Sequence, residues 1–133
     1  MRITQEADYA IRITYCLAME KQKTGAKQIA ETTGVSLRFA LKILRKLILA
    51  GIVKSYKGVN GGYELLKPPS EISLGEVIEV IDGPIAINNC LKNEFVCSRV
   101  QAPDACDFHR VFHSINDMVR KELYQIKMDQ FVK

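Results

Sequence analysis

The sequence lacks the apolar segments that would direct a chain into or across a membrane. The N-terminus, Met1-Arg2-Ile3-Thr4-Gln5-Glu6, is mostly polar, whereas a signal peptide needs an apolar run there. The longest apolar run, 47–50 continued past Gly51 by Ile52 and Val53, is far shorter than the roughly 20 residues that cross a bilayer. We therefore expect a cytoplasmic protein that makes no membrane contact.

The residue sets of common enzymes are also missing. No Ser/His/Asp set, nucleotide-binding loop or pair of acid–base carboxylates is evident. The chain has 133 residues, 47% hydrophobic and 26% charged, which suits one domain or one small domain with an appendage. We expect no enzymatic activity.

Acidic residues are absent from one long stretch. Between Gly34 and Tyr63 there are six Lys or Arg residues and no Asp or Glu. Residues 1–66 hold 11 basic and 5 acidic residues, whereas residues 67–133 hold 8 and 10. Such clustering of one sign favours a polyanionic partner over an ordinary mixed surface.

The first half of the chain predicts a helix-turn-helix. Thr4 can cap a first helix, a second runs over about 26–33, and Gly34 supplies a tight turn. Ser36 can cap a third helix that Gly51 ends. The inward stripe of this third helix is predicted to be Leu37, Ala40, Leu41, Leu44, Leu47 and Ile48.

A β-hairpin wing is predicted next. The segments 52–56 and 63–66 are strand-like, and the glycine-rich loop between them, which contains Asn60, favours a tight turn. Pro68-Pro69 marks the exit, and Ser73 has capping-box spacing before a further helix over 74–81.

The rest of the chain combines an irregular stretch with a long helix. Residues 85–105 show no periodicity, which in a compact domain indicates a functional or disordered loop. From Asp107 the spacing predicts a helix whose apolar stripe is too long for one small domain to cover, so a second subunit is expected. The stripe consists of Phe108, Val111, Phe112, Ile115, Val119, Leu123 and Ile126.

Together these patterns predict a mainly α fold with a small β-hairpin wing. It is a winged helix-turn-helix (residues 1–67) followed by a linker helix, a cysteine loop and a long C-terminal dimerisation helix (residues 68–133). The third helix and the wing are the expected contacts to double-stranded DNA. The candidate DNA-binding residues are Ser36, Arg38, Lys42, Arg45, Lys46, Lys57 and Asn60.

Three cysteines and a histidine form the second candidate site. Their spacing is Cys90-x6-Cys97-x8-Cys106-x2-His109. Thiolates are the usual ligands of iron–sulfur clusters, and a weaker fourth ligand would leave a reactive site suited to a sensor. A structural zinc site and unligated redox thiols are the alternatives. Cys16 is expected to be a small buried hydrophobe.

The sequence resembles the IscR-type winged-helix transcriptional regulators over nearly its whole length. The resemblance rests on the opening Met1-Arg2-Ile3-Thr4, on Asp8-Tyr9-Ala10 and on the wing motif Gly58-Val59-Asn60-Gly61-Gly62-Tyr63. Residues 29–30, 36–37 and 72–78 also match. The resemblance implies a homodimer that pairs through the C-terminal helix and binds a palindromic operator, mostly as a repressor.

The resemblance also bears on the cofactor. Cys90, Cys97 and Cys106 match the cysteines of the cluster-binding branch, which implies an iron–sulfur cluster of undecided nuclearity, and protein isolated without it is compatible with this prediction. His109 matches the fourth ligand of IscR-like members, and Asp8 matches a carboxylate that NsrR-like members supply from the opposite subunit. We favour His109. A cluster-free regulator of the CymR type, controlled by a protein partner or by cysteine oxidation, is the alternative function.

Overall fold

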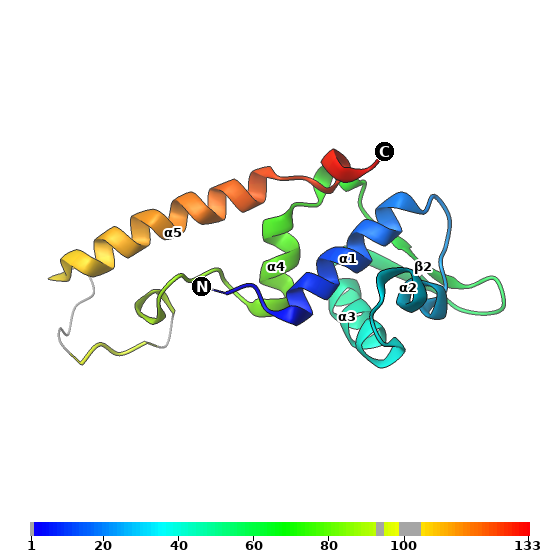
Figure 1. Cartoon of the computed structure of the whole chain (residues 1–133), viewed down its shortest axis with the longest axis horizontal. Coiled ribbons are helices and arrows are strands. Elements are labelled where there is room, and N and C mark those ends of the chain that lie inside the picture. Colours follow the sequence, from blue (N-terminus) through cyan, green and yellow to red (C-terminus); the bar gives the residue numbers. More distant parts are fainter. Residues whose placement is uncertain (1, 93–94, 99–104) are drawn as a thin grey trace.

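A computed structural model describes residues 2–92, 95–98 and 105–133; residues 1, 93–94 and 99–104 lie outside it. The main elements follow the predicted order, with short 3₁₀ turns between them (Figure 1). They are α1 (Gln5–Met19), α2 (Ala26–Thr33), α3 (Leu37–Leu49), β1 (Val53–Tyr56), β2 (Gly62–Leu65), η1 (Pro69–Glu71), α4 (Leu74–Asp82), η2 (Asn89–Leu91), α5 (Asp107–Gln125) and η4 (Met128–Phe131).

The predicted caps start α1 and α3, and the predicted glycine turn ends α2. The Thr4 hydroxyl accepts a hydrogen bond from the Ala7 amide at 3.1 Å, and the Ser36 hydroxyl accepts one from the Phe39 amide at 3.2 Å. Gly34 ends α2 with φ 72°, a left-handed conformation that glycine adopts without steric cost. The helix-turn-helix prediction is confirmed.

The buried face of α3 differs in part from the prediction. Ala40, Leu44 and Leu47 are fully buried as expected, and Ile43 joins them. Leu37 and Leu41, predicted to point inward, are 46% and 44% exposed. One residue turns a helix by about 100°, so Leu41 points away from the face that Ala40 presents to the core, and Leu37 lies in the first turn at the helix end.

The wing is an antiparallel hairpin in which Val53 pairs with Leu65 and Tyr56 with Gly62. Strand β1 begins one residue later than predicted and ends where predicted, and β2 begins and ends one residue earlier than predicted. Gly61 is required in the turn, because a Cβ atom there would come within 2.2 Å of the Tyr56 carbonyl oxygen. Strand β2 of the wing is fixed to the α1–α2 connection, since the Thr24 amide donates to the Tyr63 carbonyl at 2.9 Å.

The hydrophobic core joins both halves of the chain. Ile13 of α1 and Leu44 of α3 lie in the same buried cluster as Ile72, Val77 and Met128. The end of the chain returns to this core through backbone hydrogen bonds. The Leu74 amide donates to the Ile126 carbonyl at 2.9 Å, and the Met128 amide donates to the Ile72 carbonyl at 2.8 Å. The C-terminal end of α5 is therefore fixed.

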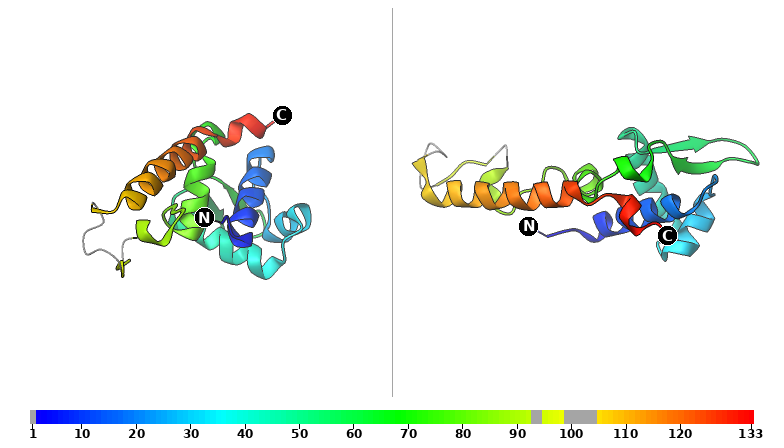
Figure 2. Two further views of the ribbon diagram at one scale, coloured as in Figure 1. Left: turned by 60° about the vertical axis from the view of Figure 1, so that its left-hand side comes forward. Right: turned by 90° about the horizontal axis from the view of Figure 1, so that it is seen from above.

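The rest of α5 extends away from the core as a long arm (Figures 1 and 2). Of its residues 107–125, all of which the structure describes, Asn116 is the buried one. The predicted apolar stripe lies on this helix, except that Ile126 is just beyond its end at Gln125. Phe108, Val111, Ile115 and Met118 are 61%, 55%, 42% and 65% exposed. A single chain thus leaves this stripe uncovered.

No helix within the described ranges is long and apolar enough to cross a bilayer.

Candidate DNA-binding surface and cysteine loop

The exposed face of α3 carries most of the predicted DNA contacts. Ser36, Arg38, Lys42 and Arg45 are exposed on it, and Lys46 is half-buried. Ser36 is the N-cap of the helix, so its hydroxyl is engaged by the Phe39 amide. The exposed cations can meet phosphates, which bind Lys and Arg in a sequence-independent way.

Two of these cations have an acidic neighbour that the sequence did not indicate. Glu6 of α1 receives Lys46 Nζ at 3.0 Å and Lys42 Nζ at 3.6 Å on one carboxylate oxygen. The Lys46 hydrogen bond is the main reason that the pKa of Glu6 lies below its ordinary value, and Lys42 contributes. Glu6 is therefore a carboxylate held between two lysines of α3.

The wing presents a second group of predicted DNA contacts. The cation Lys57 and the amide side chain of Asn60 are exposed in its turn. Lys54 on β1 lies over the Tyr56 ring with its Nζ 5.0 Å from the ring centroid, and Lys23 lies over the same ring at 3.8 Å. A hydrogen bond from the Tyr56 hydroxyl to Glu64 raises the pKa of Tyr56.

Lys23 is a candidate DNA contact that sequence reasoning missed. It lies in the connection between α1 and α2, outside the stretch that lacks acidic residues. The pairing of Thr24 with Tyr63 brings this connection beside the wing. Lys23 comes close to the wing only through tertiary contacts, so no local pattern of the sequence indicates it.

The cysteine loop places its predicted ligands on separate segments. Cys90 lies in η2, Cys97 in the loop, Cys106 at the N-cap of α5, and His109 one turn into α5; all four are half-buried. Across residues 2–92, 95–98 and 105–133, no three His, Cys, Asp or Glu side chains gather as a metal site. The four predicted ligands are therefore not assembled in the described part of the chain.

His109 has the most distinctive environment among them. Its Nδ1 atom is buried and has no hydrogen-bond partner among the described residues. Its ring lies beside that of His113, with a centroid distance of 6.3 Å. A buried nitrogen that lacks a partner usually has a reason, such as an ion or another ligand. This observation fits a metal-ligating role.

Asp8, the alternative ligand, lies on α1. Its carboxylate forms an ion pair with Arg12 at 2.9 Å, and both side chains are about half exposed. Cys16 on the same helix is 5% exposed, and burial raises the pKa of its thiol. The prediction that Cys16 is a small buried hydrophobe is confirmed.

The segment that leads into the cysteine loop is bound to α5 by Asn116. The Asn116 side-chain nitrogen donates to the Ile85 carbonyl at 2.9 Å, and its oxygen accepts from the Ile87 amide at 2.9 Å. Asn116 is 9% exposed, so these bonds are shielded from water. They fix the start of the loop against the middle of the long helix.

Glu79 of α4 holds the same segment from the other side. It accepts from the Ile85 amide at 2.8 Å, from Arg120 at 3.0 Å and from the Tyr124 hydroxyl. Burial alone would raise the pKa of Glu79, but the hydrogen bonds from these three groups lower it on balance. Burial and the hydrogen bond to Glu79 raise the pKa of Tyr124.

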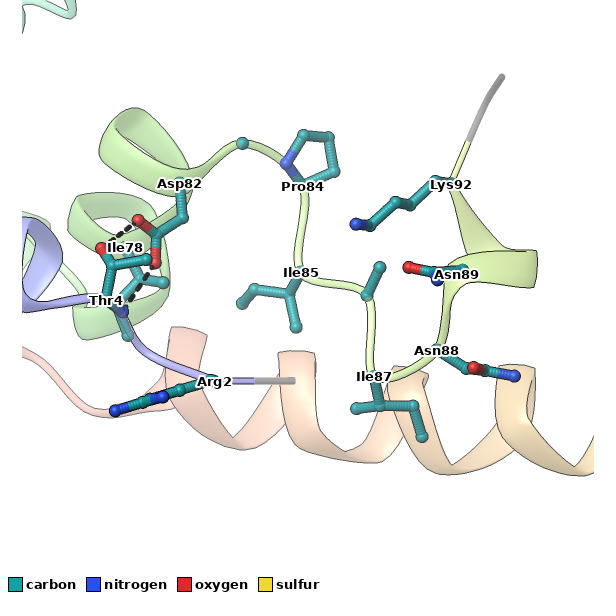
Figure 3. Close-up of a pocket in the computed structure, with 12 residues that line it drawn as sticks. Arg2, Thr4, Ile78, Asp82, Pro84, Ile85, Ile87, Asn88, Asn89 and Lys92 are labelled. Carbon is teal, nitrogen blue, oxygen red and sulfur yellow. Dashed lines mark hydrogen bonds between the residues drawn. The ribbon is translucent and has the colours of Figure 1, made fainter. Parts of the chain in front are cut away.

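A cavity of about 330 Å³ lies where this segment meets the N-terminus (Figure 3). Asp82 at the end of α4 lines it and accepts hydrogen bonds from the amide, at 3.3 Å, and the hydroxyl of Thr4. Figure 3 shows Lys92 pointing into the cavity from the far side. The Thr4–Asp82 pair joins the first turn of α1 to the end of α4.

Comparisons with known proteins agree with this architecture. A family model described as an iron-dependent transcriptional regulator, that of the Rrf2 family, matches residues 3–133. Protein aau3 of Rhizobium meliloti is 33% identical over 135 residues, covering 100% of this chain and 86% of that protein. The transcriptional regulator IscR of Pectobacterium carotovorum is 29% identical over 134 residues, covering 99% and 79%.

The solved structure of CymR, the global cysteine regulator of B. subtilis, has a TM-score of 0.78 at 28% identity, covering 98% of this chain and 95% of that one. The predicted winged-helix fold and the role in DNA binding and transcription regulation are confirmed by these matches. The chain belongs to the Rrf2 family of transcriptional regulators.

Proposed function

We propose that this regulator is controlled by an iron–sulfur cluster that Cys90, Cys97, Cys106 and His109 hold. The observation that carries the proposal is the buried Nδ1 atom of His109, which lacks a partner among the described residues and lies one turn after Cys106. Three thiolates with one imidazole suit such a cluster, because imidazole replaces thiolate in some iron–sulfur centres. When bound, the cluster would supply a centre reactive toward oxygen or nitric oxide.

The relatives support an iron-linked role without assigning it to this chain. The matched family is described as iron-dependent, and IscR is among its relatives. CymR, described as a cysteine regulator, has a closely similar structure. A regulator without a cluster, controlled by a protein partner or by cysteine oxidation, is therefore the second candidate.

The DNA-binding form that we propose is a homodimer on a palindromic operator, acting mostly as a repressor. The exposed stripe on α5 supports it, since Phe108, Val111 and Ile115 are each more than 40% exposed in one chain. An apolar stripe of this length is typical of an interface between subunits. Two copies of α3 and of the wing would then meet two half-sites.

We further propose that residues 1–67 contact the DNA and that residues 68–133 hold the cluster and the subunit interface. The two parts are linked by the hydrogen bonds of Thr4 with Asp82 and by the core that Ile13 and Leu44 share with Val77. Within the second part, Ile85 is bonded to Asn116 of α5 and to Glu79 of α4. A change at the cysteine loop would act on α3 through these contacts. A cluster can shift the affinity for DNA only by as much as the protein's affinity for the cluster differs between its two conformations.

The test begins with anaerobic purification, followed by assays of iron, acid-labile sulfide and zinc per subunit and a visible absorption spectrum. We expect iron and sulfide in matching amounts in the wild type and their loss in Cys97→Ala. Cys16→Ala is the matched control, because Cys16 is buried in α1. Zinc alone, or no metal, would favour the cluster-free regulator.

DNA binding provides the second measurement. An operator selected from a pool of random duplexes is titrated with cluster-loaded and cluster-free protein at the same salt concentration, because phosphate contacts make affinity depend strongly on salt. We expect the two forms to differ in affinity and Cys97→Ala to behave as the cluster-free form. Equal affinities would contradict control by a cluster. His109→Ala and Asp8→Ala then identify the fourth ligand.

A further inference from the structure

Among the described residues, Glu6 is the one acidic side chain placed on the cations of α3. Its Oε1 atom lies 3.0 Å from Lys46 Nζ and 3.6 Å from Lys42 Nζ. The two lysines are one helical turn apart, so one carboxylate meets both. The Glu6 side chain is 23% exposed, whereas those of Lys42 and Lys46 are 58% and 36% exposed.

The position of Glu6 is set by contacts on both sides of it. Thr4 caps α1 two residues before Glu6 and is bonded to Asp82, which fixes the first turn of the helix. One turn further along, the Tyr9 ring meets the Phe39 ring of α3 edge to face, with a centroid distance of 6.1 Å. Glu6 is therefore presented to α3 by packed neighbours.

This arrangement has a consequence for binding a polyanion. A lysine in an ion pair with a carboxylate must give up that contact, or share it, before it can neutralise a phosphate. The salt dependence of DNA binding reports the number of phosphates neutralised, with a slope of about −0.9 per phosphate for duplex DNA. An internal carboxylate that occupies two lysines should reduce both that slope and the affinity for any sequence.

We infer that Glu6 is a positioning residue that weakens sequence-independent DNA binding by holding Lys42 and Lys46 in an internal ion-pair group. The inference rests on α3 being the helix that faces DNA. Arg38 and Arg45 stay exposed on α3, while the Glu6 group lowers the electrostatic attraction to DNA of any sequence.

The experiment measures fluorescence anisotropy of a duplex of random sequence, about 30 base pairs long, over a range of salt concentrations. The variants are Glu6→Gln, which removes the charge, and Glu6→Asp, which keeps the charge but shortens its reach. Glu71→Gln in the exposed turn η1 is the matched control, since it makes the same change in net charge outside α1, α3 and the α5 stripe. Far-UV circular dichroism and thermal melting confirm that each variant is folded.

We expect Glu6→Gln to bind about tenfold tighter at low salt, with a slope steeper by about 1 to 2, because up to two more phosphates are neutralised. Glu6→Asp should change in the same direction, and Glu71→Gln should keep the wild-type slope. Adding Lys46→Gln to Glu6→Gln should return the slope toward that of the wild type.

Three results would overturn the inference. Weaker binding by Glu6→Gln would mean that Glu6 arranges the lysines for DNA. Equal changes in Glu6→Gln and Glu71→Gln would leave only net charge as the cause. If DNA binding by the wild type did not depend on salt, the cations of α3 would not contact phosphates, and both the DNA-facing role of α3 and the inference would be wrong. The first two results would contradict the inference alone.

Discussion

The winged helix and the α5 arm differ in how much of their apolar surface a single chain can bury. In the winged helix, the large side chains of α1 and α3 close around one core in which Ile13, Ile43, Leu44 and Leu47 are fully buried. In α5, Asn116 is buried while Phe108, Val111 and Ile115 remain exposed. The winged helix buries its apolar core within one chain, whereas the apolar stripe of α5 needs a partner surface to bury it.

The largest expected effects are a loss of folding stability for a change in the winged helix and a loss of subunit association for a change in α5. Leu44→Ala should lower the free energy of unfolding by about 3 kcal/mol, because it leaves a cavity in the core. Ile115→Glu should leave the fold of the single chain intact, because Ile115 is 42% exposed, but should disrupt subunit association. Chemical denaturation and sedimentation equilibrium measure the two quantities.

Ile115→Ser, which introduces a small uncharged side chain, is the milder companion to Ile115→Glu. If Ile115→Glu kept the subunit stoichiometry of the wild type, the α5 stripe would not be the interface. Leu44→Ala should retain wild-type association at concentrations where it is folded, so one variant affects folding and the other affects association.

An intermediate effect is expected at the bonds between α5 and the segment that follows α4. Asn116→Ala removes both hydrogen bonds to the segment of Ile85 and Ile87, which should cost about 1–3 kcal/mol. Binding to a selected operator should then respond less to the state of the cysteine loop, even where the protein remains folded. Ser114→Ala, at an exposed position of the same helix, is the matched control. Unaltered regulation in Asn116→Ala would show that the signal takes another route.

The smallest effect is a pH dependence at Glu79. Its pKa is lowered in the folded protein, so the stabilisation it gives is present above the unfolded-state pKa and is lost as the pH falls through the folded-state pKa. Glu79→Gln should therefore flatten the acid side of a plot of unfolding free energy against pH. Glu71→Gln, at an exposed position in η1, should leave the plot unchanged. Identical acid-side slopes for wild type and Glu79→Gln would contradict this account.

Local signals explain what could be predicted from the sequence. Caps at Thr4, Ser36 and Ser73 and the turn at Gly34 act over a few residues, so the bounds of the helices that they delimit are close to the predicted ones. Helical spacing alone does not reveal which face of α3 docks, which is why the predicted burial of Leu37 and Leu41 is wrong.

Contacts between distant residues could not be predicted. Glu6 meets Lys46 across 40 positions of sequence, and Asn116 meets Ile85 across 31. Both contacts depend on how helices pack, which no periodicity encodes. The cysteine spacing identifies the donor atoms, but part of the loop that would gather them, residues 93–94 and 99–104, lies outside the described residues.

The return of Met128 to the core anchors α5 at its C-terminal end. The 19 residues of the helix span about 28 Å at 1.5 Å per residue, from this anchored end to the turn that carries Cys106 and His109. A rotation of α5 by about 10° about the anchored end would displace that turn by about 5 Å. Conversely, a displacement of about 5 Å at that turn would reach α4 as a rotation of only about 10°, so a large change beside the cysteine loop would become a small adjustment at the DNA-binding end.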